Sequence, residues 1–422
     1  MDEAHASRPL VGLIVNPIAG LGGRVGLKGT DGPGMASRAI ALGARPMAGH
    51  RTAEALAALI EAWPADAPAP RVMTVAGAMG ANATTAAGLL PELLDERRTA
   101  GRRPTAPGAA LAARAPDDPG HAADLEVVTS AEDTRWAARE MRDRGVDLLV
   151  FSGGDGTARD ILDAVGTTIV ALGIPAGAKV QSAVFATSPG TAGRLVAAHL
   201  LAAAAGRRLA TEEREVLDLD EDAYRAGRVA PRLYGVLRVP AGRTLQSRKA
   251  PTPPSDAIAL EQIAVEVAAS LVAGRSYVLG PGSTVAAVAR ALGLPKTLVG
   301  VDVAAFEAGA SGEPRATITA MDAGENEVRA AVGDQPVSII VTPIGGQGFL
   351  FGRGNQPIGT DVIRRAGRDG LIVVASQAKI ASLGGRPLLV DTGDPALDAE
   401  LAGFVPVITG YRERTVVPVA AA

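Results

Sequence analysis

Residues 148–160 have the sequence Leu-Leu-Val-Phe-Ser-Gly-Gly-Asp-Gly-Thr-Ala-Arg-Asp, and this stretch decides the fold. Its apolar first half is typical of a buried strand, its glycines predict a tight loop, and the pattern of a helix start follows. Backbone N–H groups in such a loop can approach an anion, which the positive end of the helix also attracts. A phosphate would repel Asp155 unless this carboxylate holds a cation or removes a proton from an attacking hydroxyl. The stretch therefore indicates phosphoryl transfer.

Apolar runs and helical patterns alternate on both sides of this stretch. Residues 10–15 are apolar throughout, which predicts a strand covered on both faces. The other elements expected in the N-terminal half are helices over 52–62, 130–145 (with a cap at Ser130) and 155–165, strands over 71–76, 146–151 and 168–175, and a loop at 77–82. This order predicts an α/β fold with a doubly wound, mostly parallel sheet. The glycine loop then lies at the carboxyl end of a strand, where open α/β sheets bind ligands.

Two further segments of the N-terminal half carry candidate ligand contacts. Residues 16–32 are rich in glycine and form either a second phosphate- or sugar-facing loop or a flexible connection with tight turns. In the first case, Lys28 and Asp31 would contact substrate or phosphate. Lys179 follows a glycine-containing turn after the strand at 168–175, so it could anchor a phosphate or simply face solvent.

Composition divides the chain into three predicted regions. Residues 1–190 form the doubly wound domain, in which 96–123, with alternating Ala, Pro, Gly and charge, are expected to be a disordered surface insertion. The region 191–255 combines an alanine-rich helix with period-two alternation over 213–220 and 232–239, which predicts a small antiparallel β module, and it ends in a proline-rich linker at 250–256. The third region, 256–422, returns to an α/β pattern.

Loops of Gly, Ser, Thr and Asp recur at the ends of predicted strands in the third region. They indicate a second phosphate- or nucleotide-sized pocket, although ordinary βα connections have the same composition. The residues that such a pocket would use are Gly282, Ser283, Thr284, Asp302 in a strand over 297–303, Gly345, Gly346, Gln347 and Lys379.

Composition and missing motifs exclude several classes of protein. A chain of 422 residues is expected to hold two or three domains at roughly 150 residues each. A net charge of −3 argues against a nucleic-acid groove, and the absence of cysteine excludes disulfides and thiolate chemistry. No Walker loop, nucleophile elbow or zinc-binding His-Glu-x-x-His occurs, and Val25 occupies the position of the third glycine in a dinucleotide fingerprint.

The sequence also predicts a cytoplasmic protein without a membrane partner. The first residues lack the basic start and apolar core of a signal peptide. The longest apolar run, 195–205, has about half of the roughly 20 residues that a membrane-spanning helix needs.

The glycine loop resembles a signature of known kinase families. Residues 153–157, Gly-Gly-Asp-Gly-Thr after an apolar strand, resemble the signature shared by NAD kinases, diacylglycerol kinases, sphingosine kinases and 6-phosphofructokinases. Residues 16–22, Asn-Pro-Ile-Ala-Gly-Leu-Gly, are similar to the asparagine–proline–glycine loop of the lipid-kinase branch. Together with 23–32 and 342–356, they make the chain resemble most closely the ATP-NAD kinase family that includes acetoin-catabolism protein X. The resemblance covers nearly the whole chain except 96–123.

The resemblance implies a kinase that uses ATP, or polyphosphate, to phosphorylate NAD to NADP. It implies that Asp155 activates the acceptor hydroxyl, that Gly153, Gly154, Gly156 and Thr157 cradle the donor phosphates, and that Asn16, with Gly20 and Gly22, holds nucleotide. Mg²⁺ would neutralise the transferred group, and the family analogy implies a homo-oligomer. An ordinary aspartate pKa near 4 would leave Asp155 ionised at pH 7, with positioning carrying most of the catalysis.

One departure from the family pattern leaves the acceptor open. NAD kinases follow the loop with an Asn-Glu or Asn-Asp pair that binds the nicotinamide riboside, whereas residues 176–179 here are Ala-Gly-Ala-Lys. The C-terminal half also resembles the sugar-phosphate isomerase and deaminase fold through 280–284 and 345–348, which suggests an acceptor or effector carrying a sugar phosphate. A nucleotide-sensing protein that kept the fold without the reaction is the alternative of a different class.

Overall fold

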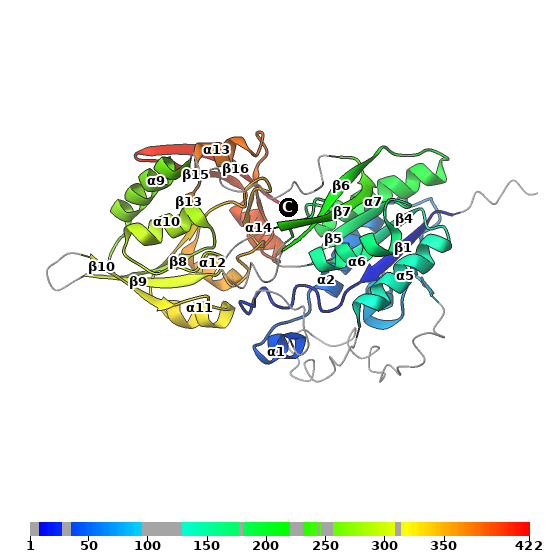
Figure 1. Ribbon diagram of the computed structural model, residues 1–422, viewed down its shortest axis with the longest axis horizontal. Helices are drawn as coiled ribbons and strands as arrows, with labels where there is room; N and C mark the ends of the chain where they lie inside the picture. The colour runs from blue at the N-terminus through cyan, green and yellow to red at the C-terminus, as the bar shows by residue number, and fades with distance from the viewer. Residues whose placement is uncertain are drawn as a thin grey trace, which may run out of the picture. The chain divides into compact units, whose positions relative to one another are not determined.

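Contacts divide the chain into two compact units in the computed structural model (Figure 1). The first comprises Met1–Leu21 and Arg45–Gln246, and the second comprises Gly22–Ala44 and Ser247–Ala422. The structure describes residues 8–27, 35–94, 129–176, 180–219, 231–242, 245, 256–308 and 314–422. The predicted insertion at 96–123 and most of the predicted linker at 250–256 lie outside these residues.

The first unit is organised around a five-stranded parallel sheet, as predicted. Its strands are β1 (Leu10–Val15), β2 (Arg71–Thr74), β3 (Pro91–Leu93), β4 (Leu148–Gly153) and β5 (Ala171–Pro175). They lie in the order β3-β2-β1-β4-β5, and every neighbouring pair is parallel. The order reverses between β1 and β4, so the glycine loop after β4 lies at the switch point of the sheet.

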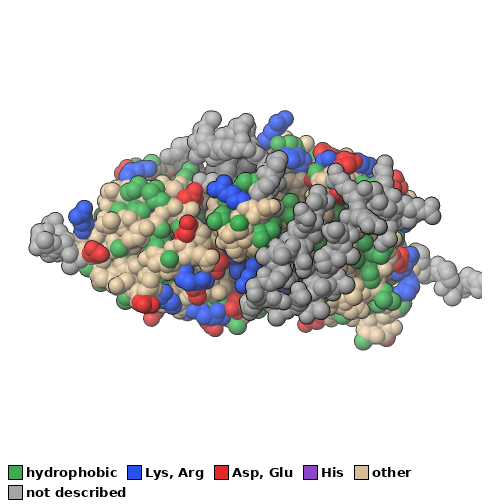
Figure 2. Space-filling view, turned by 90° about the horizontal axis from the view of Figure 1, so that it is seen from below, with side chains coloured by type: hydrophobic (Ala, Val, Ile, Leu, Met, Phe, Trp, Pro, Cys, Tyr) green, Lys and Arg blue, Asp and Glu red, His purple; other side chains and the backbone are tan. Residues whose placement is uncertain are grey.

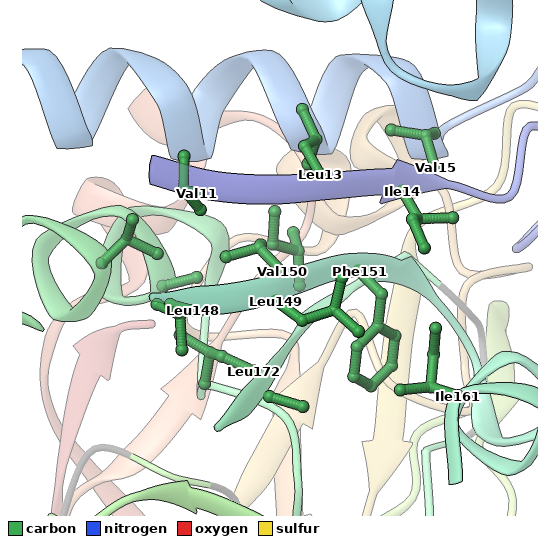
Figure 3. Packing of buried hydrophobic residues seen from close by; sticks show 14 of the residues in the cluster. Val11, Leu13, Ile14, Val15, Leu148, Leu149, Val150, Phe151, Ile161 and Leu172 are labelled. Atoms are coloured by element: carbon green, nitrogen blue, oxygen red, sulfur yellow. The ribbon is translucent and has the colours of Figure 1, made fainter. Parts of the chain in front are cut away.

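Helices cover both faces of this sheet. They are α2 (Ala48–Glu61), η1 (Gly77–Met79), α3 (Ala81–Ala86), α5 (Ala131–Asp143), α6 (Asp155–Val165) and α7 (Pro189–Ala204). Helix α2 packs against α7, and α5 packs against α6. In Figure 3, Leu13 of β1 points toward the helix above the sheet, while Phe151 of β4 points toward Ile161 of α6 below it. Both faces of the sheet are therefore buried, which explains why the strands β1 and β4 are apolar on both faces.

Local signals explain where several of these elements begin. The predicted cap of α5 is present, since Ser130 accepts from the backbone N–H of Asp133 and the Asp133 carboxylate accepts from Ser130 N at 2.8 Å. The segment 77–82, predicted as a loop, instead forms η1 and the start of α3. Gly80 makes this possible, because its φ of 148° reverses the chain between the two short helices.

The predicted antiparallel module is a two-stranded hairpin that belongs to the first unit. Strands β6 (Thr211–Leu219) and β7 (Pro231–Pro240) pair antiparallel, with a bulge between Val216 and Leu217. Val216, Leu237 and Val239 are buried in the same hydrophobic core as the parallel sheet. The hairpin is therefore part of the core of this unit.

The second unit contains a nine-stranded mixed sheet with helices. Its described elements are α1 (Met35–Ala41), α9 (Ala257–Ser270), β8 (Arg275–Leu279), α10 (Ser283–Ala291), β9 (Asp302–Ala308), β10 (Pro314–Ala320), α11 (Glu325–Val332), β11 (Val337–Val341), β12 (Phe349–Phe351), α12 (Thr360–Ala366), β13 (Leu371–Val374), α13 (Gln377–Ala381), β14 (Leu388–Val390), α14 (Pro395–Leu401), β15 (Gly403–Gly410) and β16 (Glu413–Ala421). The strand order is β10-β9-β8-β11-β13-β15-β16-β14-β12. Strands β8, β11, β13 and β15 run parallel, which confirms the predicted α/β class.

The division into units differs from the three predicted regions in two places, since residues 191–246 belong to the first unit and residues 22–44 to the second. The segment 22–44, predicted in the N-terminal domain, has contacts with α11 and the residues before it. Glu325 N donates to Arg24 O at 2.7 Å, and the two side chains approach to 3.8 Å. Gly324 packs so closely on Val25 that an added Cβ would lie 3.1 Å from the Val25 backbone. These backbone contacts make 22–44 part of the second unit.

The surface of the described residues carries charges of both signs, as expected from the small net charge of the sequence. On the face seen in Figure 2, the described Lys and Arg side chains are interspersed with Asp and Glu. Among the residues that the structure describes, no helix combines the length and the apolar character needed to cross a membrane.

The contact between α2 and α7 generates a stability prediction. A Cβ on Gly193 of α7 would lie 2.0 Å from Ala55 O of α2, so Gly193→Ala must push the helices apart. We expect a loss of about 3 kcal/mol in the free energy of unfolding, measured by urea denaturation. Gly190→Ala in the same helix is the control, since its Cβ would meet only the end of the Arg194 side chain. An equal effect of the two substitutions would contradict the packing argument.

Candidate functional site

The glycine loop after β4 ends in an uncapped helix N-terminus. Gly153 is the last residue of β4, Gly154 is the N-cap of α6 in an extended conformation, and Asp155 is the first helical residue. Gly154 provides no side-chain cap. The first N–H groups of α6 lack partners within the helix, so they and the helix dipole favour an anion here. The residues predicted as a phosphate cradle thus lie where such a cradle is physically possible.

The loop after β1 meets the same helix. Asn16 N donates to Ser152 O at 2.9 Å, and Asn16 Nδ2 donates to the Thr157 hydroxyl at 3.0 Å. Gly20, with a φ of 80°, turns the chain shortly after Asn16. Two predicted nucleotide-binding residues that lie 141 positions apart in the sequence are therefore in direct contact at the switch point of the sheet.

Gly153 is required for this contact. A Cβ at this position would lie 2.4 Å from the Thr157 hydroxyl oxygen and 2.5 Å from its Cβ. No rotation of a threonine side chain relieves an overlap with its own Cβ. Glycine at 153 therefore lets the first turn of α6 fold back onto the end of β4.

Asp155 is buried and held by two backbone groups. Only 6% of the surface of Asp155 is exposed to solvent. Its Oδ2 accepts from Gln181 N at 2.7 Å, and its Oδ1 accepts from Ser182 N at 2.9 Å. The carboxylate therefore has a fixed orientation, set by the segment that follows β5.

Burial raises the pKa of Asp155 from 3.8 to about 7. Desolvation is the largest cause, hydrogen bonds from Ser182 and Gln181 oppose it, and the nearby charge of Asp218 adds to it. The expectation of an ordinary pKa near 4 was therefore wrong, because it ignored the desolvation that the fold imposes. A carboxyl group with a pKa near neutrality suits proton transfer at physiological pH.

Sequence reasoning missed the groups that surround Asp155. Arg159, one turn further along α6, pairs with Asp218 of β6 at 3.1 Å and lies 5.3 Å from the centroid of the Tyr234 ring. The Ser182 hydroxyl bonds to the backbone of Leu217. The only sequence signal for Ser182 is a polar pair, Gln181-Ser182, within an otherwise apolar run.

The second unit brings three predicted loops together. Strands β8, β11 and β13 are parallel neighbours, so their carboxyl ends share one edge. Lys379, in the loop and helix after β13, donates from Nζ to the Thr342 hydroxyl after β11 at 2.9 Å. A Cβ on Gly282, which has a φ of 116° and precedes α10, would lie 2.9 Å from Thr342 Cγ2. The structure thus brings Lys379 and Gly282, which is followed by Ser283 and Thr284 at the start of α10, to Thr342, a residue outside the predicted set.

The other predicted residues of the second unit are mainly structural in their contacts. The turn after β11 contains Gly345, Gly346 and Gln347, and Gly346 O accepts from Arg386 at 2.8 Å. Asp302 is fully buried, and its carboxylate pairs with Lys296 Nζ at 2.8 Å. It also accepts from the backbone N–H of Thr297 at 2.8 Å.

Strand β9 begins at Asp302 rather than at 297, because these contacts hold residues 297–301 outside the sheet. Lys28, Asp31 and Lys179 lie outside the described residues. Gly22 is described in the second unit, where its carbonyl accepts from Leu27 N at 2.9 Å.

The donor groups of the described residues do not form a protein cage for a metal. Within the described ranges, no group of three or more His, Cys, Asp or Glu side chains could hold an ion.

The chain belongs to the ATP-NAD kinase family. Residues 11–202 match the ATP-NAD kinase N-terminal domain, and residues 273–419 match the ATP-NAD kinase C-terminal domain. The predicted family is thereby confirmed. A comparison with curated proteins found no match.

Among solved structures, the chain is similar to a protein from Bacillus anthracis str. Sterne that carries an assignment as a diacylglycerol kinase. The identity is 14% and the TM-score is 0.23, with 51% of this chain and 47% of that chain covered. The chain thus spans about half the length of that structure.

The raised pKa of Asp155 predicts a pH-dependent stability. Because the folded state binds this proton more tightly, the stabilisation is fully present below pH 3.8 and is lost as the pH rises through about 7. Relative to Asp155→Asn, the wild type should lose about 1.4 kcal/mol of unfolding free energy per pH unit between pH 5 and 7. Urea denaturation of both proteins from pH 5 to 9 measures the difference. A difference that does not change with pH would show that Asp155 titrates normally.

Proposed function

We propose that this protein is a small-molecule kinase that transfers a phosphoryl group from ATP, or from polyphosphate, to a hydroxyl of NAD. The observation that carries the proposal is the buried carboxylate of Asp155 beside the uncapped N-terminus of α6, at the switch point of a parallel sheet. Membership of the ATP-NAD kinase family supports a nucleotide as substrate.

The first turn of α6 binds the donor phosphates in this proposal. The N–H groups of Gly154, Gly156 and Thr157 face the phosphate oxygens, and Asn16 fixes the Thr157 side chain through their 3.0 Å hydrogen bond. Mg²⁺ held by the phosphates supplies charge neutralisation during transfer. Preorganised backbone dipoles of this kind stabilise developing charge without rearrangement.

Asp155 accepts the proton of the acceptor hydroxyl. As the hydroxyl oxygen forms its bond to the terminal phosphorus, the bond from this phosphorus to the bridging oxygen breaks, and ADP or shortened polyphosphate leaves. The proton of the hydroxyl passes to the carboxylate. Two carboxylate oxygens offer about four lone-pair sites, so Asp155 can accept this proton while it still accepts from Gln181 N and Ser182 N.

The second unit, taken by itself, holds a separate group of side chains that suits an anion. Lys379, the Thr342 hydroxyl and the start of α10 lie at one edge of three parallel strands. A cationic side chain beside hydroxyls and a helix start suits a phosphate monoester. This set suits a ligand that carries phosphate, which NAD and a sugar phosphate both do.

The deciding experiment pairs donors with acceptors. ATP and polyphosphate are each incubated with NAD, NADH and a set of phosphosugars, and products are identified by mass spectrometry. The wild type should phosphorylate NAD, and Asp155→Asn should lose about 100-fold or more in turnover while still binding nucleotide.

Asp160→Asn is the matched control, because Asp160 is a buried carboxylate on the same helix that pairs with Arg135 at 2.6 Å. It should retain activity. Full activity of Asp155→Asn would refute the proposed base. Thermal stabilisation by nucleotide without any product would instead favour the nucleotide-sensing alternative.

Gly153→Ala tests the phosphate cradle separately from the chemistry. The added methyl group displaces Thr157 and with it the first turn of α6. We expect at least about tenfold weaker binding of ATP by calorimetry, equivalent to one lost hydrogen bond. Gly49→Ala is the control, since nothing lies within 4 Å of the new Cβ. Unchanged ATP affinity of Gly153→Ala would place the nucleotide elsewhere.

A further inference from the structure

Ser182 is a buried serine whose hydroxyl bonds to the backbone of Leu217 in β6, as a neighbouring strand would. Its Oγ donates to Leu217 O at 2.8 Å and accepts from Leu217 N at 3.0 Å. The next residue continues this attachment, since Ala183 N donates to Glu215 O at 3.0 Å. Ser182 is fully inaccessible to solvent. The segment after β5 is thus fastened to β6 through one side chain and one backbone bond.

The backbone of the same residue faces Asp155. Ser182 N donates to Asp155 Oδ1 at 2.9 Å, and the preceding Gln181 N donates to Oδ2 at 2.7 Å. The Ser182 N–H leaves the same residue as the anchored hydroxyl, and the Gln181 N–H belongs to the residue before it. An anchor on β6 therefore lies within one residue of both donors.

We propose that Ser182 is a positioning residue for Asp155: by bonding both backbone groups of Leu217, its hydroxyl holds the N–H groups of Gln181 and Ser182 against the carboxylate. The proposal deepens the proposed function, on which its catalytic consequence rests. In this proposal the β6–β7 hairpin, through Leu217, helps to orient the proposed base, although the hairpin lies outside the parallel sheet.

Loss of the anchor should favour the protonated form of Asp155. Hydrogen bonds to a carboxylate favour its charged form, and Ser182 is the principal group that lowers the pKa of Asp155 against the effect of burial. The hairpin also presents Asp218, whose charge raises this pKa.

Two other charged side chains of α6, both among the residues that the structure describes, are paired. On α6, Arg159 pairs with Asp218 and packs on Tyr234 of β7, while Asp160 pairs with Arg135 of α5. Removing the Ser182 hydroxyl alters none of these charges, so the shift reports the loss of this hydroxyl and of the hydrogen bonds that depend on it.

The kinetic test compares pH profiles of Ser182→Ala and wild type. Ser182→Ala should move the acid limb of kcat/KM upward by about one pH unit, giving about tenfold lower activity near pH 6 and near-normal activity at pH 9. The KM for the donor should stay within about twofold, because the cradle at α6 is unchanged. Activity lowered by the same factor at every pH would overturn the proposal.

Ser188→Ala is the matched control. Ser188 is also a buried serine of this unit, and its hydroxyl caps α7 by accepting from Thr191 N at 3.2 Å. Its removal should lower stability without moving the acid limb. An equal shift in both variants would show that general loosening, rather than the Ser182 anchor, causes it.

A substrate-free measurement separates this proposal from the kinase assignment. The effect of Ser182→Ala on the free energy of unfolding is measured from pH 5 to 9 in the wild type and in Asp155→Asn. The effect should depend on pH only when Asp155 is present. This outcome supports the anchor even if no kinase product is found, and a pH-independent effect in both backgrounds refutes it.

Ser182→Cys provides a second variant for the case that the alanine protein does not fold. The thiol fits a similar space but donates weakly, so the acid limb of the kcat/KM profile should move in the same direction as in Ser182→Ala, by a smaller amount. An acid limb at the same pH as that of the wild type would overturn the proposal.

Discussion

The first unit depends on a carboxylate that the fold removes from water. Asp155 begins helix α6 at the switch point of the sheet, and its two oxygens accept from backbone N–H groups of a segment that follows a different strand. Burying a charge in this way is costly unless hydrogen bonds compensate for the lost hydration. The compensation here is partial, which is why the pKa of Asp155 rises to about 7. The same arrangement fixes the carboxylate in one orientation.

Around this carboxylate, glycines allow neighbouring segments of the chain to approach each other closely. Gly153 lets Thr157 fold back onto the end of β4, where Asn16, in the loop after the neighbouring strand β1, reaches its hydroxyl. The second unit repeats the principle with Gly282 against Thr342. In each unit, loops at the carboxyl ends of adjacent parallel strands meet because one residue has no side chain. Such edges are where open α/β sheets bind their ligands.

Strong local patterns made much of the fold predictable. The strand over 10–15, the capped helix after Ser130 and the hairpin of β6 and β7 followed from periodicity and capping residues. Strands β15 and β16 were not predicted, and each contains a proline, Pro406 and Pro418, which weakens the sequence signal of a strand in the interior of a sheet. The place of residues 22–44 was also missed, since their partners lie about 300 residues further along the chain.

The sequence by itself determined the family, the class of fold and the stretch 153–157, because glycine spacing after an apolar run is a local signal. It also pointed to Asn16, although not to the contact between Asn16 and Thr157. Only the tertiary structure decided the state of Asp155, since its pKa depends on desolvation and on donors that arrive from after β5. Ser182 and Leu217, which hold those donors, are separated by 35 residues and share no motif. Local pattern identifies the proposed base, whereas packing sets its environment.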